Sequence, residues 1–238
     1  MALRVSLAGW LIGMQLGLVI SAQAHPSANY YSIKWASAQR PIITWSFDND
    51  FPSGSGWRSR VISGANTWDA NQPTELQFDD LPDVVKTFSS NCNDWGLEQN
   101  VLFFRDLGSG GGTLATTGAC GQAGNPSLYK NFTMSFDSSE DWHTGTGNPP
   151  PSGCVPYCVD AWGISTHEFG HGTGGWLSGS AAGHFDPTAN PGLCGTPGAT
   201  DYHTMCITYQ PSTSGDPARG ARWRSTETHD DHTFDGAY

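Results

Sequence analysis

Apolar and polar residues alternate in two stretches of the chain, 41–47 and 132–136. A period of two is typical of a strand that buries one face. Two other short runs, 76–78 and 101–105, are mainly apolar, and the second is typical of a strand buried on both faces. These segments predict the strands of a sheet. Residues 25–40, which precede them, are expected to form an irregular entry segment.

A first helix is predicted by apolar residues that recur at helical spacing. Trp57, Val61, Ala65 and Trp68 lie three or four positions apart and therefore share one face of a helix. We expect this aromatic face to pack into the core and not to bind a ligand.

A second helix is predicted around the apolar stretch 159–164, which can bury one side of a helix. Gly172, Gly174 and Gly175 follow it, and glycine accepts the left-handed conformation in which helices often end. We therefore expect the helix to end just after His171, so that the chain can turn back towards it.

This second helix carries the sequence His-Glu-Phe-Gly-His at 167–171. Residues four apart on a helix lie about 40° apart around its axis and one turn along it, so both imidazoles reach one point in space. A single metal ion needs this arrangement, and a glutamate beside the first histidine can act as general base in zinc peptidases. We therefore predict His167 and His171 as zinc ligands and Glu168 as the catalytic base. A plain helix with two surface histidines is the other interpretation.

The stretch resembles the metzincins, zinc metalloproteases with the pattern H-E-x-x-H-x-x-G-x-x-H. Gly174 falls on the glycine of that pattern, but the third histidine falls on Leu177, which has no donor atom. The next histidine is His184, so we infer a loop insertion that displaces the ligand; such insertions cost little. The resemblance thus predicts His184 as the third zinc ligand, with Asp186 and Asp201 as alternatives.

A second similarity lies at 203–209, His-Thr-Met-Cys-Ile-Thr-Tyr. It resembles the Met-turn of metzincins and implies that Met205 lies beneath the zinc site. The match is nearest to the matrixin-like secreted proteases, with Ile207 in place of their proline. The glycine-rich segment 106–115 resembles the turn before the edge strand of that family.

The pattern of elements and the resemblance together predict an α/β fold of the metzincin, or zincin-like, type. A mixed, mostly parallel sheet is expected to be backed by both helices, with an irregular lobe beyond Gly174 and the active-site cleft between the lobes. We expect His143 to lie at the surface, and we expect His143, His229 and His232 to lie outside the metal site.

The first 24 residues have the features of a secretion signal. Arg4 precedes a mostly apolar run, 11–20, and Ala-Gln-Ala at 22–24 is a small-x-small cleavage site. The run is short for a membrane span, and no other stretch is long and apolar enough for one. We predict a secreted protein with a signal peptide at 1–24 and one catalytic domain at 25–238; an uncleaved anchor is the alternative.

The net charge of the chain limits the classes of partner that it is expected to bind. A formal net charge of −11 argues against nucleic acid, whose binding needs a basic face. Acidity suits solubility or calcium sites. Calcium is thus a candidate second cofactor, although no acidic loop has the ligand spacing.

The chain contains six cysteines, all beyond the signal segment, which predicts disulfides in an oxidising compartment. Pairing of neighbours would give Cys92–Cys120, Cys154–Cys158 and Cys194–Cys206, and other pairings stay open. A cysteine–histidine zinc site is the competing idea, but paired C-x-x-C units are missing.

We therefore predict a secreted zinc endopeptidase that hydrolyses peptide bonds through a zinc-bound water, with Glu168 as the base. The expected partner is a protein or peptide substrate, with no nucleic acid and no membrane, and the chain is expected to be a monomer. Two other functions stay open. One is an inactive secreted binding protein on the same fold, which the displaced third ligand favours; the other is a zinc hydrolase of non-peptide substrates.

Overall fold

The computed structural model of the 238-residue chain describes residues 33–36, 40, 42–54, 56–71, 76–89, 91, 100–108, 113–145 and 159–175. In chain order, the elements of this part are β1 (Ile33–Lys34), β2 (Ile42–Asp48), α1 (Trp57–Asn71), β3 (Gln77–Val84), β4 (Asn100–Arg105), β5 (Ala115–Gln122), β6 (Asn125–Asp137), β7 (Trp142–His143), β8 (Val159–Asp160), α2 (Ala161–Thr173) and β9 (Gly174–Gly175).

The described strands form one main sheet with the order β3-β2-β4-β6-β1-β9, and β5 also pairs with β6. β2 is parallel to β3 and β4, β4 is parallel to β6, and β1 is parallel to β6. β5 runs antiparallel to β6, and β9 runs antiparallel to β1. A small separate sheet joins β7 and β8 in parallel. Within this part of the chain, the predicted α/β class with a mixed, mostly parallel sheet is therefore confirmed.

Strand β6 is the longest strand of the described part, and β1, β4 and β5 all pair with it. β5 pairs with it from Asn125 to Phe136 and so occupies one edge. β4 and β1 must therefore share the opposite edge, where β4 lies beside 133–137 and β1 lies beside Leu128. β5 is consequently an edge strand, since no strand of the described part pairs with its outer side.

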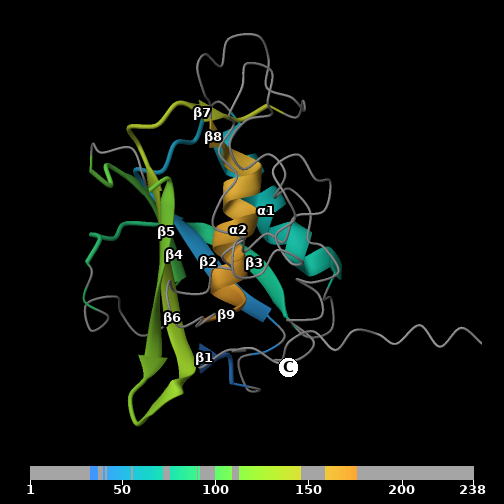
Figure 1. Ribbon diagram of the computed structural model, residues 1–238, viewed down its shortest axis with the longest axis vertical. Helices are drawn as coiled ribbons and strands as arrows, with labels where there is room; N and C mark the ends of the chain where they lie inside the picture. Colours follow the sequence, from blue (N-terminus) through green and yellow to red (C-terminus); the bar gives the residue numbers. More distant parts are fainter. Residues whose placement is uncertain are drawn as a thin grey trace, which may run out of the picture.

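Both helices lie on the same side of the sheet (Figure 1). α1 connects β2 to the parallel strand β3, as a helix does in a β-α-β unit. Trp57, Val61, Ala65 and Trp68 are all buried, so the helical stripe in the sequence does form part of the core. α2 packs beside α1 and extends towards β5.

The two helices meet at Gly64 of α1. A Cβ atom added there would lie 2.6 Å from the Cβ of Ser165 and 2.7 Å from the backbone nitrogen of Thr166. Only the missing side chain lets α1 approach the backbone of α2 so closely. One turn away, Trp68 donates from Nε1 to the carbonyl oxygen of Thr166 at 2.8 Å, which fixes the two helices against each other.

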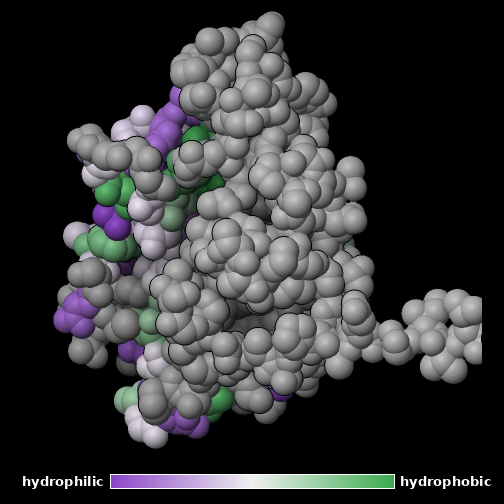
Figure 2. All heavy atoms as spheres, viewed as in Figure 1, coloured by the Kyte–Doolittle hydropathy of each residue, from purple (hydrophilic) through white to green (hydrophobic). Residues whose placement is uncertain are grey.

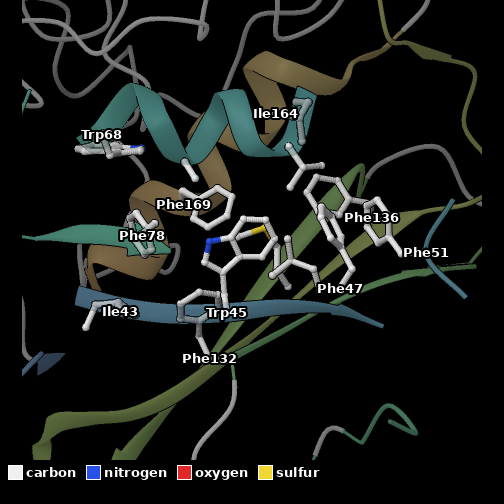
Figure 3. Close-up of a cluster of buried hydrophobic side chains, with 14 of the residues drawn as sticks. Ile43, Trp45, Phe47, Phe51, Trp68, Phe78, Phe132, Phe136, Ile164 and Phe169 are labelled. Atoms are coloured by element: carbon white, nitrogen blue, oxygen red, sulfur yellow. The ribbon is translucent and has the colours of Figure 1, made fainter. Parts of the chain in front are cut away.

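Aromatic side chains fill the space between the helices and the sheet (Figure 3). Phe169 from α2 is fully buried and lies edge-on to Trp45 and Phe78, with ring centroids 5.3 Å and 4.9 Å apart. Such pairs contribute about 0.5–1.5 kcal/mol each beyond the area they bury. The helix is thereby anchored to β2 and β3.

Two strands are longer than the hydrophobic pattern indicates. β3 continues past Phe78 through mostly exposed residues, including Pro82, which an edge strand tolerates because its outer N–H groups need no partner. β6 starts at Asn125, well before the alternating stretch. The expectation of an irregular segment at 25–40 is wrong at its end, since Ile33–Lys34 form β1 and Trp35 is buried.

The surface of the described strands is mixed in character. Hydrophilic and hydrophobic residues are interspersed on the coloured part of Figure 2. The exposed large hydrophobic side chains of the described part are Ile42, Leu81 and Val85. Among the helices that the structure describes, none is long and apolar enough to cross a membrane.

Candidate active site

The N-terminal end of α2, the helix that carries the His-Glu-Phe-Gly-His motif, is held in place by the two residues before it. Asp160 is fully buried, and its Oδ2 accepts a hydrogen bond from the backbone N–H of Gly163 at 2.8 Å. An aspartate at this position satisfies a free N–H group, and its charge is favourable at the positive end of the helix dipole. β8, which contains Asp160, pairs with β7, so the start of α2 is held by the small sheet.

Phe169 sets the rotation of α2 about its own axis. Its ring is buried against the sheet. At about 100° per residue, His167 and His171 both lie about 160° away from Phe169, and Glu168 lies about 100° away. The histidines therefore point away from the sheet, whereas Glu168 is directed sideways to β5, where Thr117 binds it.

Aromatic donors hold the last turn of α2. The carbonyl groups at a helix end have no partner within the helix. Here the hydroxyl of Tyr129 donates to the carbonyl oxygen of His171 at 2.6 Å, and Nε1 of Trp35 donates to that of Gly172 at 2.8 Å. The two rings stack with centroids 4.8 Å apart. The backbone around His171 is thus attached to β6 and to Trp35, the residue that follows β1.

The helix ends at Thr173, close to the predicted position, but for another reason than the one expected. Glycines with positive φ in the described part are Gly56, Gly108 and Gly124, and none of them follows α2. The chain instead passes directly into β9, whose Gly174 and Gly175 pair with β1. The predicted left-handed glycine at this helix end is therefore wrong.

His167 and His171 lie side by side on the face of α2 that is turned away from the sheet. Their ring centroids are 5.0 Å apart and the ring planes are inclined at 82°. Two imidazoles on one tetrahedral zinc, at metal–nitrogen distances of about 2.0–2.1 Å, place their ring centres roughly 5 Å apart. His167 is 5% exposed, which disfavours the interpretation of an ordinary pair of surface histidines. The spacing and the donor type therefore fit a shared zinc ion.

Glu168 is a buried carboxylate with 5% of its surface exposed. Burial raises the pKa of Glu168 to about 7, because the charged form loses solvation; the hydrogen bond from Thr117 acts in the opposite direction. Thr117 donates from Oγ1 to Oε2 of Glu168 at 2.6 Å. A carboxyl group with a pKa near neutrality is well matched to proton transfer.

The predicted third ligand, His184, lies outside the described residues, as do Asp186, Asp201 and Met205. Within the described part, no group of three histidine, cysteine, aspartate or glutamate side chains is placed to hold a metal. The assignment of His184 and the calcium site therefore stay predictions. Cys120 is buried on β5, and because the other five cysteines are outside the described part, their pairing also stays a prediction.

Sequence reasoning missed several residues around the motif. Thr117, Trp35 and Tyr129 contact α2 across 51, 137 and 42 positions of the chain, and no local pattern indicates such contacts. His143, expected at the surface, is only 7% exposed. Asp160 could have been found, because an aspartate just before an apolar helical stretch is a common N-cap.

The chain matches no family model, and a search of curated proteins finds no relative. The metzincin resemblance therefore depends on the motif residues themselves, and the function must be argued from the geometry of α2.

Proposed function

We propose that this chain is a secreted zinc-dependent endopeptidase. The observation that carries the proposal is the pair of imidazoles 5.0 Å apart on α2, with a buried carboxylate between them in the sequence. Two neutral nitrogen donors from one helix and a third ligand beyond Gly174 would complete a zinc site of the catalytic type. The proposal that the chain is secreted rests on the signal-like segment at 1–24.

Zn²⁺ supplies a Lewis acid that polarises the substrate carbonyl and makes water more acidic. His167 and His171 would hold the ion, with His184 as the expected third ligand. Glu168 accepts a proton from water as the water oxygen bonds to the carbonyl carbon of the scissile peptide. Glu168 then returns that proton to the amine nitrogen when the carbon–nitrogen bond breaks.

The environment of Glu168 suits this role. An isolated buried carboxylate holds its proton more tightly than one in water, which is why its pKa is raised to about 7. A divalent cation on the neighbouring histidines would favour the ionised form. The base would therefore be ionised at neutral pH and would still be basic enough to take a proton from water.

Strand β5 favours a peptide over other substrates. It is an edge strand of the described sheet, and it lies next to the carboxylate through Thr117. Where it passes Thr117, the outer edge of such a strand can offer backbone N–H and C=O groups. An extended peptide can pair with them by strand addition, which would place its backbone beside Glu168.

The proposal is tested by digesting an unbiased peptide library with the mature protein and identifying the products by mass spectrometry. We expect cleavage at internal peptide bonds that stops when zinc is chelated and returns when zinc is added. A protein that contains zinc but leaves every peptide intact would favour the inactive binding protein. Hydrolysis confined to non-peptide test esters would favour the other zinc hydrolase.

A further inference from the structure

In the described part of the chain, one side-chain hydrogen bond reaches the Glu168 carboxylate, and it comes from strand β5. Oγ1 of Thr117 lies 2.6 Å from Oε2 of Glu168 and 3.3 Å from the backbone carbonyl oxygen of the same residue. The hydroxyl therefore contacts both the carboxylate and the backbone carbonyl group of Glu168. A glutamate rotamer that moved the carboxylate away from β5 would lose the shorter contact.

Thr117 is itself held firmly by the sheet. It pairs with Met134 of β6, which is fully buried. Threonine is branched at Cβ, so its χ1 angle has few allowed values. Glutamate, by contrast, loses much rotamer freedom when it is ordered. The strand thus provides a fixed donor for a side chain that would otherwise sample several positions.

We propose that Thr117 is a positioning residue for the general base. It binds Oε2 of Glu168 and leaves Oε1 as the oxygen that takes the proton from water. This inference rests on the proposed peptidase function. Proton transfer requires an oxygen within about 2.6–3.2 Å of the group that loses the proton. Because a displacement of about 1 Å can reduce a rate about a hundredfold, one fixed rotamer has a large kinetic value.

A purely structural contact between β5 and α2 is the alternative role of this hydrogen bond. In that case its loss would lower stability but leave turnover unchanged in the folded protein. The two roles are separated by turnover and by the orientation of the Glu168 side chain, since a structural contact alone controls neither.

The experiment compares Thr117→Val, which removes the hydroxyl, with Thr117→Ser, which keeps it. Thr87→Val is the control, because Thr87 is an exposed threonine that lies outside β5 and α2. We expect Thr117→Val to lower kcat roughly ten- to hundredfold, with KM changed by less than about twofold and bound zinc unchanged. Thr117→Ser and Thr87→Val should stay within about threefold of the wild type.

Crystal structures of the metal-free wild type and the Thr117→Val variant give a second readout that does not depend on activity. We expect one Glu168 rotamer in the wild type. In the variant, we expect the Glu168 side chain to be displaced or to occupy two rotamers. A wild-type kcat in Thr117→Val, an equal loss in Thr117→Ser, or an unchanged Glu168 rotamer overturns the positioning role. If the wild type cleaves no peptide, the proposed function fails, and the two crystal structures still decide whether Thr117 orients the carboxylate.

Discussion

Replacing Glu168 by glutamine is expected to lower kcat/KM for a cleaved peptide by roughly 10²–10⁴-fold, while zinc stays bound. The amide keeps the size and shape of the side chain but cannot accept the proton from water. The measurement is steady-state hydrolysis of a peptide chosen from the library digest, with zinc content determined on the same sample.

Stability provides the control for this variant. Burial raises the pKa of Glu168 from 4.5 to about 7, so the ionised side chain opposes folding of the metal-free protein, and this cost develops as the pH rises between those values. Glutamine carries no charge, and its carbonyl oxygen can accept the hydrogen bond from Thr117. At pH 8 the metal-free variant should therefore unfold at the same or a higher temperature than the wild type.

A Glu168→Gln variant that retains more than about a tenth of the wild-type rate of peptide hydrolysis would show that Glu168 is not the base.

A methyl group added at Gly64 is expected to destabilise the protein by about 2 kcal/mol or more. In most exposed helix positions, the change from glycine to alanine increases stability by up to about 1 kcal/mol. At Gly64 the new Cβ would lie within 3.0 Å of Ser165 and of the backbone of Thr166. These backbone atoms cannot rotate away, so α1 and α2 must separate. Chemical denaturation of Gly64→Ala measures the loss.

Gly54→Ala is the matched control for this substitution. Gly54 is exposed, and a Cβ added there would meet no atom within 4 Å. Its free energy of unfolding should stay within about 0.5 kcal/mol of the wild type. Equal stability of Gly64→Ala and Gly54→Ala would show that the helices do not touch at Gly64.

The parts of the fold that were predicted well are those in which burial imposes a period on the sequence. Residues 41–47 and the stripe from Trp57 to Trp68 each have one face in the core, and both predictions are confirmed by β2 and α1. β3 was underestimated because most of its residues are exposed and lack alternation. β1 was missed because two residues carry no period, and its position depends on pairing with β6 and β9.

Some features of the candidate site can likewise be predicted from the sequence, and others cannot. The spacing of His167 and His171 is a local property of a helix, so the sequence alone indicates that the rings lie together, as they do. The orientation of these rings depends on Phe169, and that of the carboxylate depends on Thr117. Both are contacts between segments far apart in the chain. One side of α2 was expected to be buried, whereas nearly every residue of α2 is buried.

The central claim, that His167 and His171 together bind a catalytic zinc, is tested most directly by the zinc content of the dialysed protein, measured by elemental mass spectrometry. We predict about one Zn²⁺ per chain in the wild type and in the His229→Ala control, and almost none in His167→Ala and in His171→Ala. A folded wild type without zinc, or single-histidine variants that keep the wild-type zinc content, would contradict the claim.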